Sequence, residues 1–370
     1  MKPEDYITRE EKYGAHNYHP LPVVLRRGEG VFVWDVEGKR YFDFLSGYSA
    51  LSQGHCHPKI VKALMEQAER LTLVSRAFHA DILGEYMEFT CKFFGYDKLL
   101  PMNTGAEAVE TALKLCRRWG YRRKGVAPER AKIVVCSENF HGRTITIISM
   151  STDPSSYADF GPYTPGFIKI PYNNVDALAE ALKDPDAVGF LVEPIQGEAG
   201  VVVPDDGYLR ACYDLCHQKN VLFIADEIQT GIGRTGKLLA CDYEGIRPDI
   251  LILGKALSGG VSPVSAVLAD DEIMLTIAPG EHGSTYGGNP LAAKVAIAAL
   301  EVVRDEHLSE NAFKMGELFR GEMERINNPM IKKVRGKGLL NAVVTEPKDG
   351  KTAWDICLAS VSYTHLRAHE

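Results

Sequence analysis

Two short apolar runs in the middle of the chain each lead into charged side chains. Val221–Ala225 is followed by Asp226 and Glu227, and Ile250–Leu253 is followed, after one glycine, by Lys255. Both runs have the length and the β-branched content of buried strands. In open α/β sheets, ligands bind beyond the carboxyl ends of the strands. We therefore expect Asp226 and Lys255 to converge on one ligand that needs both an anion and an amine.

The ligand that best suits this pair is pyridoxal phosphate. A lysine amine can form a Schiff base with its aldehyde, and a carboxylate can keep its pyridine nitrogen protonated. The same two charges, taken alone, also fit a structural ion pair at a sheet edge. The glycines at 231, 233 and 236 match G-x-G-x-x-G, the dinucleotide-binding fingerprint. That fingerprint must follow a strand directly, and these glycines do not, so we discount it. Residues 231–238 also nearly match the phosphate-binding Walker A motif. Leu238 occupies the position where that motif requires a Ser or Thr to bind magnesium, so we discount this match as well.

Two further segments are suited to a phosphate group. Gly105 and Ala106 open a helix that we expect to run to about Trp119, and a helix N-terminus is a ready anion site. An ordinary helix cap explains the same pattern equally well. Ser284 and Thr285 lie in a glycine-rich turn and supply two hydroxyl groups. Both segments are candidates for binding the cofactor phosphate.

Residues after the expected strand 132–136 are candidates for the cofactor ring and the substrate. Phe140 can stack on a cofactor ring, although an aromatic residue there is more often part of the core. Arg143 can bind a substrate carboxylate with its planar guanidinium, although arginine is more often a surface residue. A strand at 189–193 also ends in a carboxylate, and a glycine-rich loop with Glu198 follows it.

The alternation of strands and helices from about 100 to 270 predicts an α/β fold with a mainly parallel sheet. Outside this region we expect a hairpin around residues 37–38, a helix from Pro58, and a helix over 290–303 that crosses to a second domain. The expected division is an N-terminal segment (1–51), a large domain (52–298), a partial small domain (299–358) and a tail (359–370).

Composition excludes several classes of protein. The net charge is −7 and the pI is about 5.9, which argues against nucleic acid as a partner. No apolar run is long enough to cross a membrane. The 8 cysteines include no C-x-x-C motif, so we expect a reducing compartment and no metal site. The N-terminus has neither a signal peptide nor an arginine-rich leader, so the expected compartment is the cytoplasm.

From Tyr13 to about Leu358, the chain resembles the ornithine aminotransferases. These are class III, fold-type I pyridoxal-phosphate enzymes, and their active form is at least a homodimer. The blocks that carry the resemblance are 12–20 (KYGAHNYHP), 53–58 (QGHCHP), 193–200 (EPIQGEAG), 226–236 (DEIQTGIGRTG), 254–260 (GKALSGG) and 282–290 (HGSTYGGNP).

The resemblance implies a role for each candidate residue. Lys255 carries the Schiff base and moves the proton, Asp226 pairs with the pyridine nitrogen, Gln229 meets the ring hydroxyl, and Phe140 stacks on the ring. Gly105 and Ala106, with Ser284 and Thr285 of the neighbouring subunit, hold the phosphate. Tyr18 and Arg143 bind the α-amino and α-carboxylate end of L-ornithine, Tyr48 closes the pocket, and Glu198 masks a second arginine that 2-oxoglutarate needs.

The resemblance ends near Leu358, and the segment that carries the second arginine in the family is absent. Arg335 and Arg367 do not match the family's motif for that arginine. We therefore expect a truncated or mis-spliced reading of a full-length enzyme, with an unrelated tail. If the chain really ends here, we expect poor stability and weak or absent turnover with 2-oxoglutarate. Animal relatives work in the mitochondrial matrix, so the matrix is an alternative compartment.

Two other functions fit the sequence. One is a related class III enzyme that acts on acetylornithine or 4-aminobutyrate; Tyr18 favours ornithine, because a free α-amino group needs a polar partner there. The other is a truncated non-catalytic paralogue that binds the cofactor without turnover.

Overall fold

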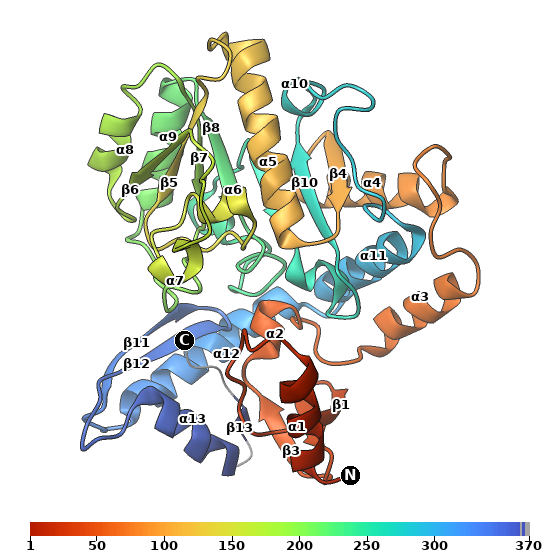
Figure 1. The fold of residues 1–370 in the computed structure, drawn as a ribbon, viewed down its shortest axis with the longest axis vertical. Coiled ribbons are helices and arrows are strands. Elements are labelled where there is room, and N and C mark those ends of the chain that lie inside the picture. The colour runs from red at the N-terminus through yellow and green to blue at the C-terminus, as the bar shows by residue number, and fades with distance from the viewer. Residues whose placement is uncertain (363–364, 367–370) are drawn as a thin grey trace.

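The computed structural model describes residues 1–362 and 365–366. Its upper body is built on one large sheet, and its lower body combines the first 50 or so residues with the last elements of the chain (Figure 1). The large sheet has 7 strands. In spatial order these are β4 (Lys98–Met102), β10 (Ser265–Ala269), β9 (Ile250–Leu253), β8 (Leu222–Asp226), β7 (Ala187–Val192), β5 (Lys132–Cys136) and β6 (Phe167–Ile170).

The large sheet is mainly parallel, which confirms the expected fold class. Strands β9, β8, β7, β5 and β6 pair in parallel, whereas β10 is antiparallel to both β9 and β4. The carboxyl ends of β5, β7, β8 and β9 therefore meet at one edge of the sheet. That edge faces the lower body (Figure 1).

Helices cover both faces of this sheet, and its central strands are therefore buried on both sides. Consecutive strand residues point to opposite faces. Ile224, for example, packs with helix α5 on one face, whereas Phe223 packs with helices α8 and α9 on the other. Helices α4 and α11 cover that second face over β9 and β10. The bounds of these helices are α4 (Asp81–Phe94), α5 (Gly105–Trp119), α8 (Val175–Ala181), α9 (Tyr208–Gln218) and α11 (Pro290–Asp305).

The lower body contains two small sheets. The N-terminal one has the order β1 (Leu25–Glu29), β2 (Phe32–Asp35), β3 (Arg40–Asp43) and β13 (His365–Leu366), and β2 with β3 forms the expected hairpin. The other is the hairpin of β11 (Ile331–Lys337) and β12 (Leu340–Thr345). The remaining helices of the chain's two ends are α1 (Pro3–Tyr13), α2 (Ser46–Ser49), α3 (Pro58–Ala68), α12 (Leu308–Arg325) and α13 (Ala353–Ser362).

Short elements complete the described part of the chain. They are π-helix η1 (Gly120–Lys124), α6 (Ile145–Ile148), α7 (Pro154–Tyr157), 3₁₀ helices η2 (Ala240–Glu244) and η3 (Lys255–Ser258), and α10 (Asp271–Met274). Helix α11 runs without a break across residue 298, so the domain boundary placed there stays a prediction. Among the helices described, none is long and apolar enough to pass through a membrane.

Candidate active site

A cavity of about 220 Å³ lies at the carboxyl edge of the large sheet. It is lined by Gly105, Ala106, Phe140, His141, Gly142, Glu193, Ile195, Asp226, Ile228, Gln229, Thr230 and Lys255. This lining includes the residues predicted from the sequence to hold the cofactor ring and to carry the Schiff base. The two charges that end neighbouring strands therefore do converge on one space, as their positions after β8 and β9 predict.

Asp226 is the last residue of β8 and Glu227 is the first residue after it, and their carboxylates have different surroundings. Asp226 lines the cavity, where its Oδ1 accepts a hydrogen bond of 3.1 Å from the amide of Ile228. Glu227 is fully buried and accepts a hydrogen bond of 2.8 Å from the amide of Cys241, and another from the hydroxyl of Thr230. Asp226 thus faces the cavity, whereas Glu227 stabilises the loop that follows β8.

Asp226 is paired with a residue that the sequence analysis missed. Nδ1 of His141 lies 2.7 Å from Oδ2 of Asp226, and both side chains are buried. Burial alone would lower the pKa of His141, but the hydrogen bond and the charge of Asp226 outweigh it and raise this pKa. A charged His141 compensates the Asp226 carboxylate in a cavity where an isolated charge would be costly.

Glu193 is a second buried carboxyl group of the cavity that received no role from the sequence. It follows β7, and its Oε1 accepts a hydrogen bond of 2.8 Å from the amide of Phe140. Burial raises the pKa of Glu193 to about 7; the charge of His141 opposes this effect, and the charge of Asp226 adds to it. The sequence signal that points to His141 and Glu193 is their position. These two residues follow β5 and β7, which are parallel to β8 in the same part of the sheet, and β8 ends in Asp226.

The N-terminus of α5 borders the cavity through Gly105 and Ala106. Thr104 caps this helix: its hydroxyl accepts from the amide of Glu107, and Oε2 of Glu107 accepts from the amide of Thr104 at 3.0 Å. This reciprocal cap satisfies the amides of residues 104 and 107. The first-turn amides of Gly105 and Ala106 have no acceptor within the helix and can bind an anion.

Lys255 begins the short helix η3 in a left-handed conformation, with φ at 42°. A non-glycine residue in this region is strained, and such strain is found mainly at functional sites. The preceding Gly254 lies close to Ile228, since a Cβ on it would fall 3.3 Å from Cγ2 of that residue. The tight turn from β9 into η3 thus brings the Lys255 side chain to the cavity.

The cavity's donor set suits pyridoxal phosphate. It offers an amine, a carboxylate whose charge is stabilised by His141, and helix amides for a phosphate group. Gln229 and Phe140 complete the predicted ring contacts. The described residues include no cluster of three or more His, Cys, Asp or Glu that could hold a metal ion.

The predicted substrate residues lie outside the lining of this cavity. Arg143 is exposed, and its guanidinium lies 5.3 Å from the ring centre of Phe140. Oε1 of Glu198 accepts a hydrogen bond of 3.0 Å from Nε2 of Gln229, which joins it to the cavity wall. Tyr18 and Tyr48 are 77% and 38% exposed. The substrate roles of these residues stay predictions.

Ser284 and Thr285 also lie outside the cavity lining. Oγ of Ser284 accepts a hydrogen bond of 2.8 Å from Nδ2 of Asn103, next to the cap of α5, and Thr285 is exposed. Their turn is held against α5 by His282, which hydrogen-bonds Thr111 and Lys114 at 2.8 Å each. The role of the two hydroxyls in a neighbouring subunit's phosphate site stays a prediction.

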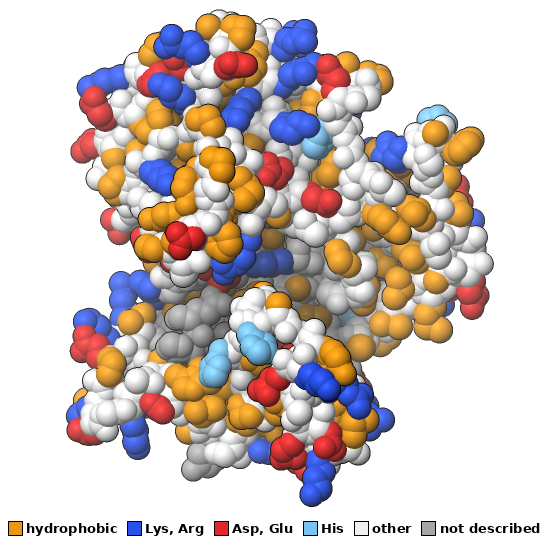
Figure 2. Space-filling view, viewed as in Figure 1, with side chains coloured by type: hydrophobic (Ala, Val, Ile, Leu, Met, Phe, Trp, Pro, Cys, Tyr) orange, Lys and Arg blue, Asp and Glu red, His pale blue; other side chains and the backbone are white. Residues whose placement is uncertain are grey.

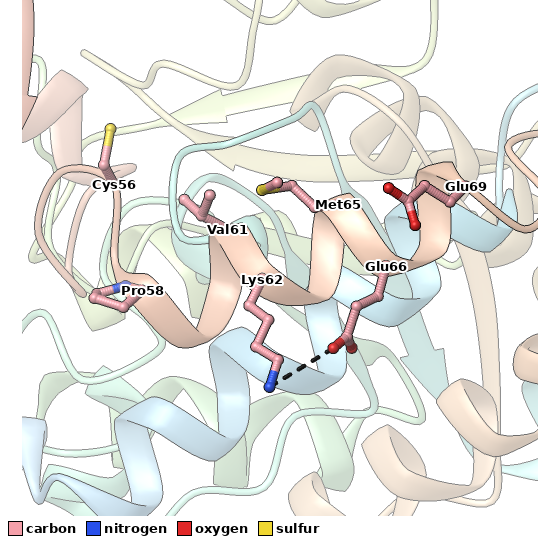
Figure 3. A pocket seen from close by; sticks show the side chains of 7 residues that line it. All are labelled: Cys56, Pro58, Val61, Lys62, Met65, Glu66 and Glu69. Carbon is pink, nitrogen blue, oxygen red and sulfur yellow. Dashed lines mark ion pairs between the residues drawn. The ribbon is translucent and has the colours of Figure 1, made fainter.

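A larger hollow of about 440 Å³ lies over helix α3 (Figure 3). Its lining includes Cys56 and Met65, and its ion pair, Lys62 with Glu66 at 3.7 Å, runs along the exposed face of one helix. The amine and the carboxylate of this pair bind each other at the surface, and neither is held in a buried site. The smaller cavity at the sheet edge is therefore the candidate active site.

In Figure 2, a recess with basic side chains along it separates the upper from the lower body.

Comparison with known proteins agrees with this site. The aminotransferase class-III profile matches residues 13–362. The mitochondrial ornithine aminotransferase of Drosophila ananassae is 64% identical over 355 residues, which cover 96% of this chain and 82% of that protein.

Two solved structures have the same fold. A Toxoplasma gondii ornithine aminotransferase with partial occupancy of pyridoxal phosphate at its active site has a TM-score of 0.98 and 50% identity, over 99% of this chain and 87% of that one. The acetylornithine aminotransferase of Elizabethkingia anophelis has a TM-score of 0.92 and 61% identity, over 99% and 91%. The chain belongs to the class-III aminotransferases, which are fold-type I enzymes that depend on pyridoxal phosphate.

Proposed function

We propose that this class-III aminotransferase transfers the δ-amino group of L-ornithine to 2-oxoglutarate. The products are glutamate 5-semialdehyde, which cyclises with loss of water to pyrroline-5-carboxylate, and glutamate. The observation that carries the proposal is the convergence of Lys255 and Asp226 on one cavity, in a chain that is 64% identical to an ornithine aminotransferase.

The residues of the cavity divide the work. When bound, pyridoxal phosphate supplies an electron sink that makes the carbon beside the transferred amine acidic. The Lys255 amine removes and returns the proton at that carbon. Asp226, with His141 behind it, holds a proton on the ring nitrogen, and this requires a carboxylate that stays ionised. Gly105 and Ala106 would bind the phosphate, Phe140 would contact the ring, and Gln229 would bind its hydroxyl.

The substrate residues must distinguish two amines of the same molecule. In the proposal, Tyr18 and Arg143 hold the α-amino and α-carboxylate end, and Tyr48 closes the pocket around it. With that end fixed, only the δ-amine is placed to react. In the proposal, Glu198 allows one pocket to accept both L-ornithine, which has two amines, and 2-oxoglutarate, which has two carboxylates.

We propose a homodimer, or a larger assembly of dimers, as the active form. Ser284 and Thr285 would reach the phosphate of the neighbouring subunit, and their position outside this chain's own cavity lining supports that role. Both the cytoplasm and the mitochondrial matrix remain predictions for the compartment, and the Drosophila relative is named as mitochondrial.

The test compares three amine donors with the protein loaded with pyridoxal phosphate. L-ornithine, N-acetylornithine and 4-aminobutyrate are each supplied with 2-oxoglutarate, and the glutamate formed is quantified by chromatography. We expect L-ornithine to be preferred at least tenfold in kcat/KM. A preference for N-acetylornithine would assign the activity of the Elizabethkingia structure instead. Cofactor binding with no conversion of the bound pyridoxal phosphate to its amine form by any donor would support a non-catalytic paralogue.

A further inference from the structure

The loop that carries Glu198 is closed on itself and strained. We call residues 196–202 the Glu198 loop. At its base, the amide of Gln196 donates to the carbonyl of Val202 at 3.1 Å, and the amide of Val202 donates back at 2.8 Å. Inside it, Val201 has a φ of 57°, a left-handed conformation that a β-branched residue adopts only when its surroundings impose it. Part of the constraint is internal, because the amides of Gly200 and Val201 both donate to the carbonyl of Gly197, and a further constraint acts from outside the loop.

The outside constraint comes from the β11–β12 hairpin of the lower body. Nε of Arg335, on β11, donates a hydrogen bond of 2.8 Å to the carbonyl of Gly200. The guanidinium also packs on this glycine, since a Cβ there would fall 3.1 Å from Nη2 of Arg335. Beneath this contact, Val201 and Leu340 of β12 are buried together in a small apolar cluster. The hairpin thus holds the loop by one charged hydrogen bond and by apolar packing.

The other side of the Glu198 loop touches the active-site cavity. Glu198 accepts the hydrogen bond of Gln229, which lines the cavity. Gly197 lies so close to the same side chain that a Cβ on it would fall 1.5 Å from Oε1 of Gln229. A displacement of the loop therefore moves Glu198 and Gln229 together. The guanidinium on Gly200, together with the packing of Val201 with Leu340, opposes that displacement.

We propose that Arg335 is a positioning residue that fixes the Glu198 loop and thereby sets how the pocket discriminates L-ornithine from 2-oxoglutarate. The inference rests on the proposed function, because it assigns an effect to Glu198. Without Arg335, the loop relaxes from its strained form, the Glu198–Gln229 hydrogen bond is lost, and Glu198 presents a mobile negative charge to the entering substrate. A diacid is repelled by that charge, whereas the cationic amine of L-ornithine is not.

The experiment compares Arg335→Met, Arg335→Lys and a matched control, Lys333→Met. Lys333 is an exposed cation on the same strand, so its substitution reports the loss of a hairpin charge without the loop contact. Hydrogen exchange of the amides of 196–202 is measured in the cofactor-free proteins, together with thermal unfolding. KM and kcat are then measured for each substrate in the loaded enzymes.

For Arg335→Met we expect faster exchange in residues 196–202 and unchanged exchange in β8. The KM for 2-oxoglutarate should rise about fivefold to tenfold, which is the size of the effect of one ordinary hydrogen bond, with less than a twofold change for L-ornithine. Arg335→Lys, which keeps a cationic donor, should recover part of both effects, and Lys333→Met should behave as the wild type.

Unchanged loop exchange in Arg335→Met, or an equal rise in KM for both substrates, would overturn the proposal. Should Arg335→Met fail to fold, the exchange and KM values of Arg335→Lys decide in its place, because a lysine amine reaches the Gly200 carbonyl less well than a guanidinium. The exchange measurement needs no turnover. A wild type without activity on L-ornithine therefore refutes the proposed function separately from the constraint on the loop.

Discussion

The buried pair of His141 and Asp226 gives a prediction whose size follows from its geometry. The two side chains are 0% and 5% exposed, and their Nδ1 and Oδ2 atoms lie 2.7 Å apart. Removing one member of a buried ion pair leaves the other charge without compensation, at a cost of about 3–5 kcal/mol. We expect His141→Phe to lower the free energy of unfolding of the cofactor-free protein by about this amount.

A double-mutant cycle separates this pair from the loss of packing. The free energy of unfolding in urea is measured for the wild type, His141→Phe, Asp226→Asn and the double variant, and we expect a coupling energy of about 2 kcal/mol. His217 and Asp249 form the matched control. Their atoms lie 3.3 Å apart and their side chains are 42% and 22% exposed, so solvent screening should reduce their coupling to about 0.2–1 kcal/mol.

The coupling should also depend on pH in one direction. The pKa of His141 is raised in the folded protein, so the folded state holds this proton more tightly than the unfolded chain does. The stabilisation is complete below the ordinary histidine pKa of about 6.5 and is lost as the pH rises through the folded-state value. The coupling should therefore be larger at pH 6 than at pH 9. A coupling below about 0.5 kcal/mol at pH 6, or one that grows with pH, would refute the reasoning.

Three further predictions follow from the surroundings of the cavity. Gly197→Ala should displace the flexible end of Gln229 and weaken the binding of pyridoxal phosphate about tenfold, with little change in the thermal midpoint; cofactor titration by fluorescence checks this, and unaltered affinity would contradict it. Burial raises the pKa of Glu193 to about 7, so its stabilisation is present at low pH and lost as the pH rises through 7. Relative to the wild type, the free energy of unfolding of Glu193→Gln should therefore increase from pH 5 to pH 8, and a flat difference would argue against a raised pKa. Burial and the neighbouring Lys114 lower the pKa of His282, so its contribution is present above pH 6.5 and lost below it. The protection factors of amides 278–289, which are the exchange rates corrected for the intrinsic rate at each pH, should fall between pH 7 and pH 5, and Lys114→Met should lessen that response.

The central strands and the cavity could be predicted because local signals define them. Strands β5 and β9 have the predicted bounds, Lys132–Cys136 and Ile250–Leu253, since short β-branched runs between turns favour buried strands. Asp226 and Lys255 meet because parallel strands bring their carboxyl ends to one edge. The strand assignments, together with the positions of the two residues at the strand ends, were therefore enough to predict that they meet.

Other features depend on contacts that no local pattern encodes. Helix α1 was not predicted, since it buries none of its residues and has no apolar stripe to reveal it. The partner of Asp226, His141, comes from a strand that is not adjacent in the sheet, so the pairing needs the strand order. The Arg335–Gly200 contact joins residues far apart in the sequence and required the arrangement of both bodies.

This last contact also has a consequence for biosynthesis. Gly200 and Arg335 are separated by 135 positions, and a ribosome adds about 5–20 residues per second. Gly200 is therefore synthesised about 7–27 s before the arginine that holds its loop, and the last strand of the large sheet to be made, which ends at Ala269, about 3–13 s before it. During that interval nothing from the hairpin offsets the strain at Val201. The Glu198 loop should be the last part of the cavity to reach its final shape, so a newly made chain acquires its discrimination between substrates only after its C-terminal hairpin has docked.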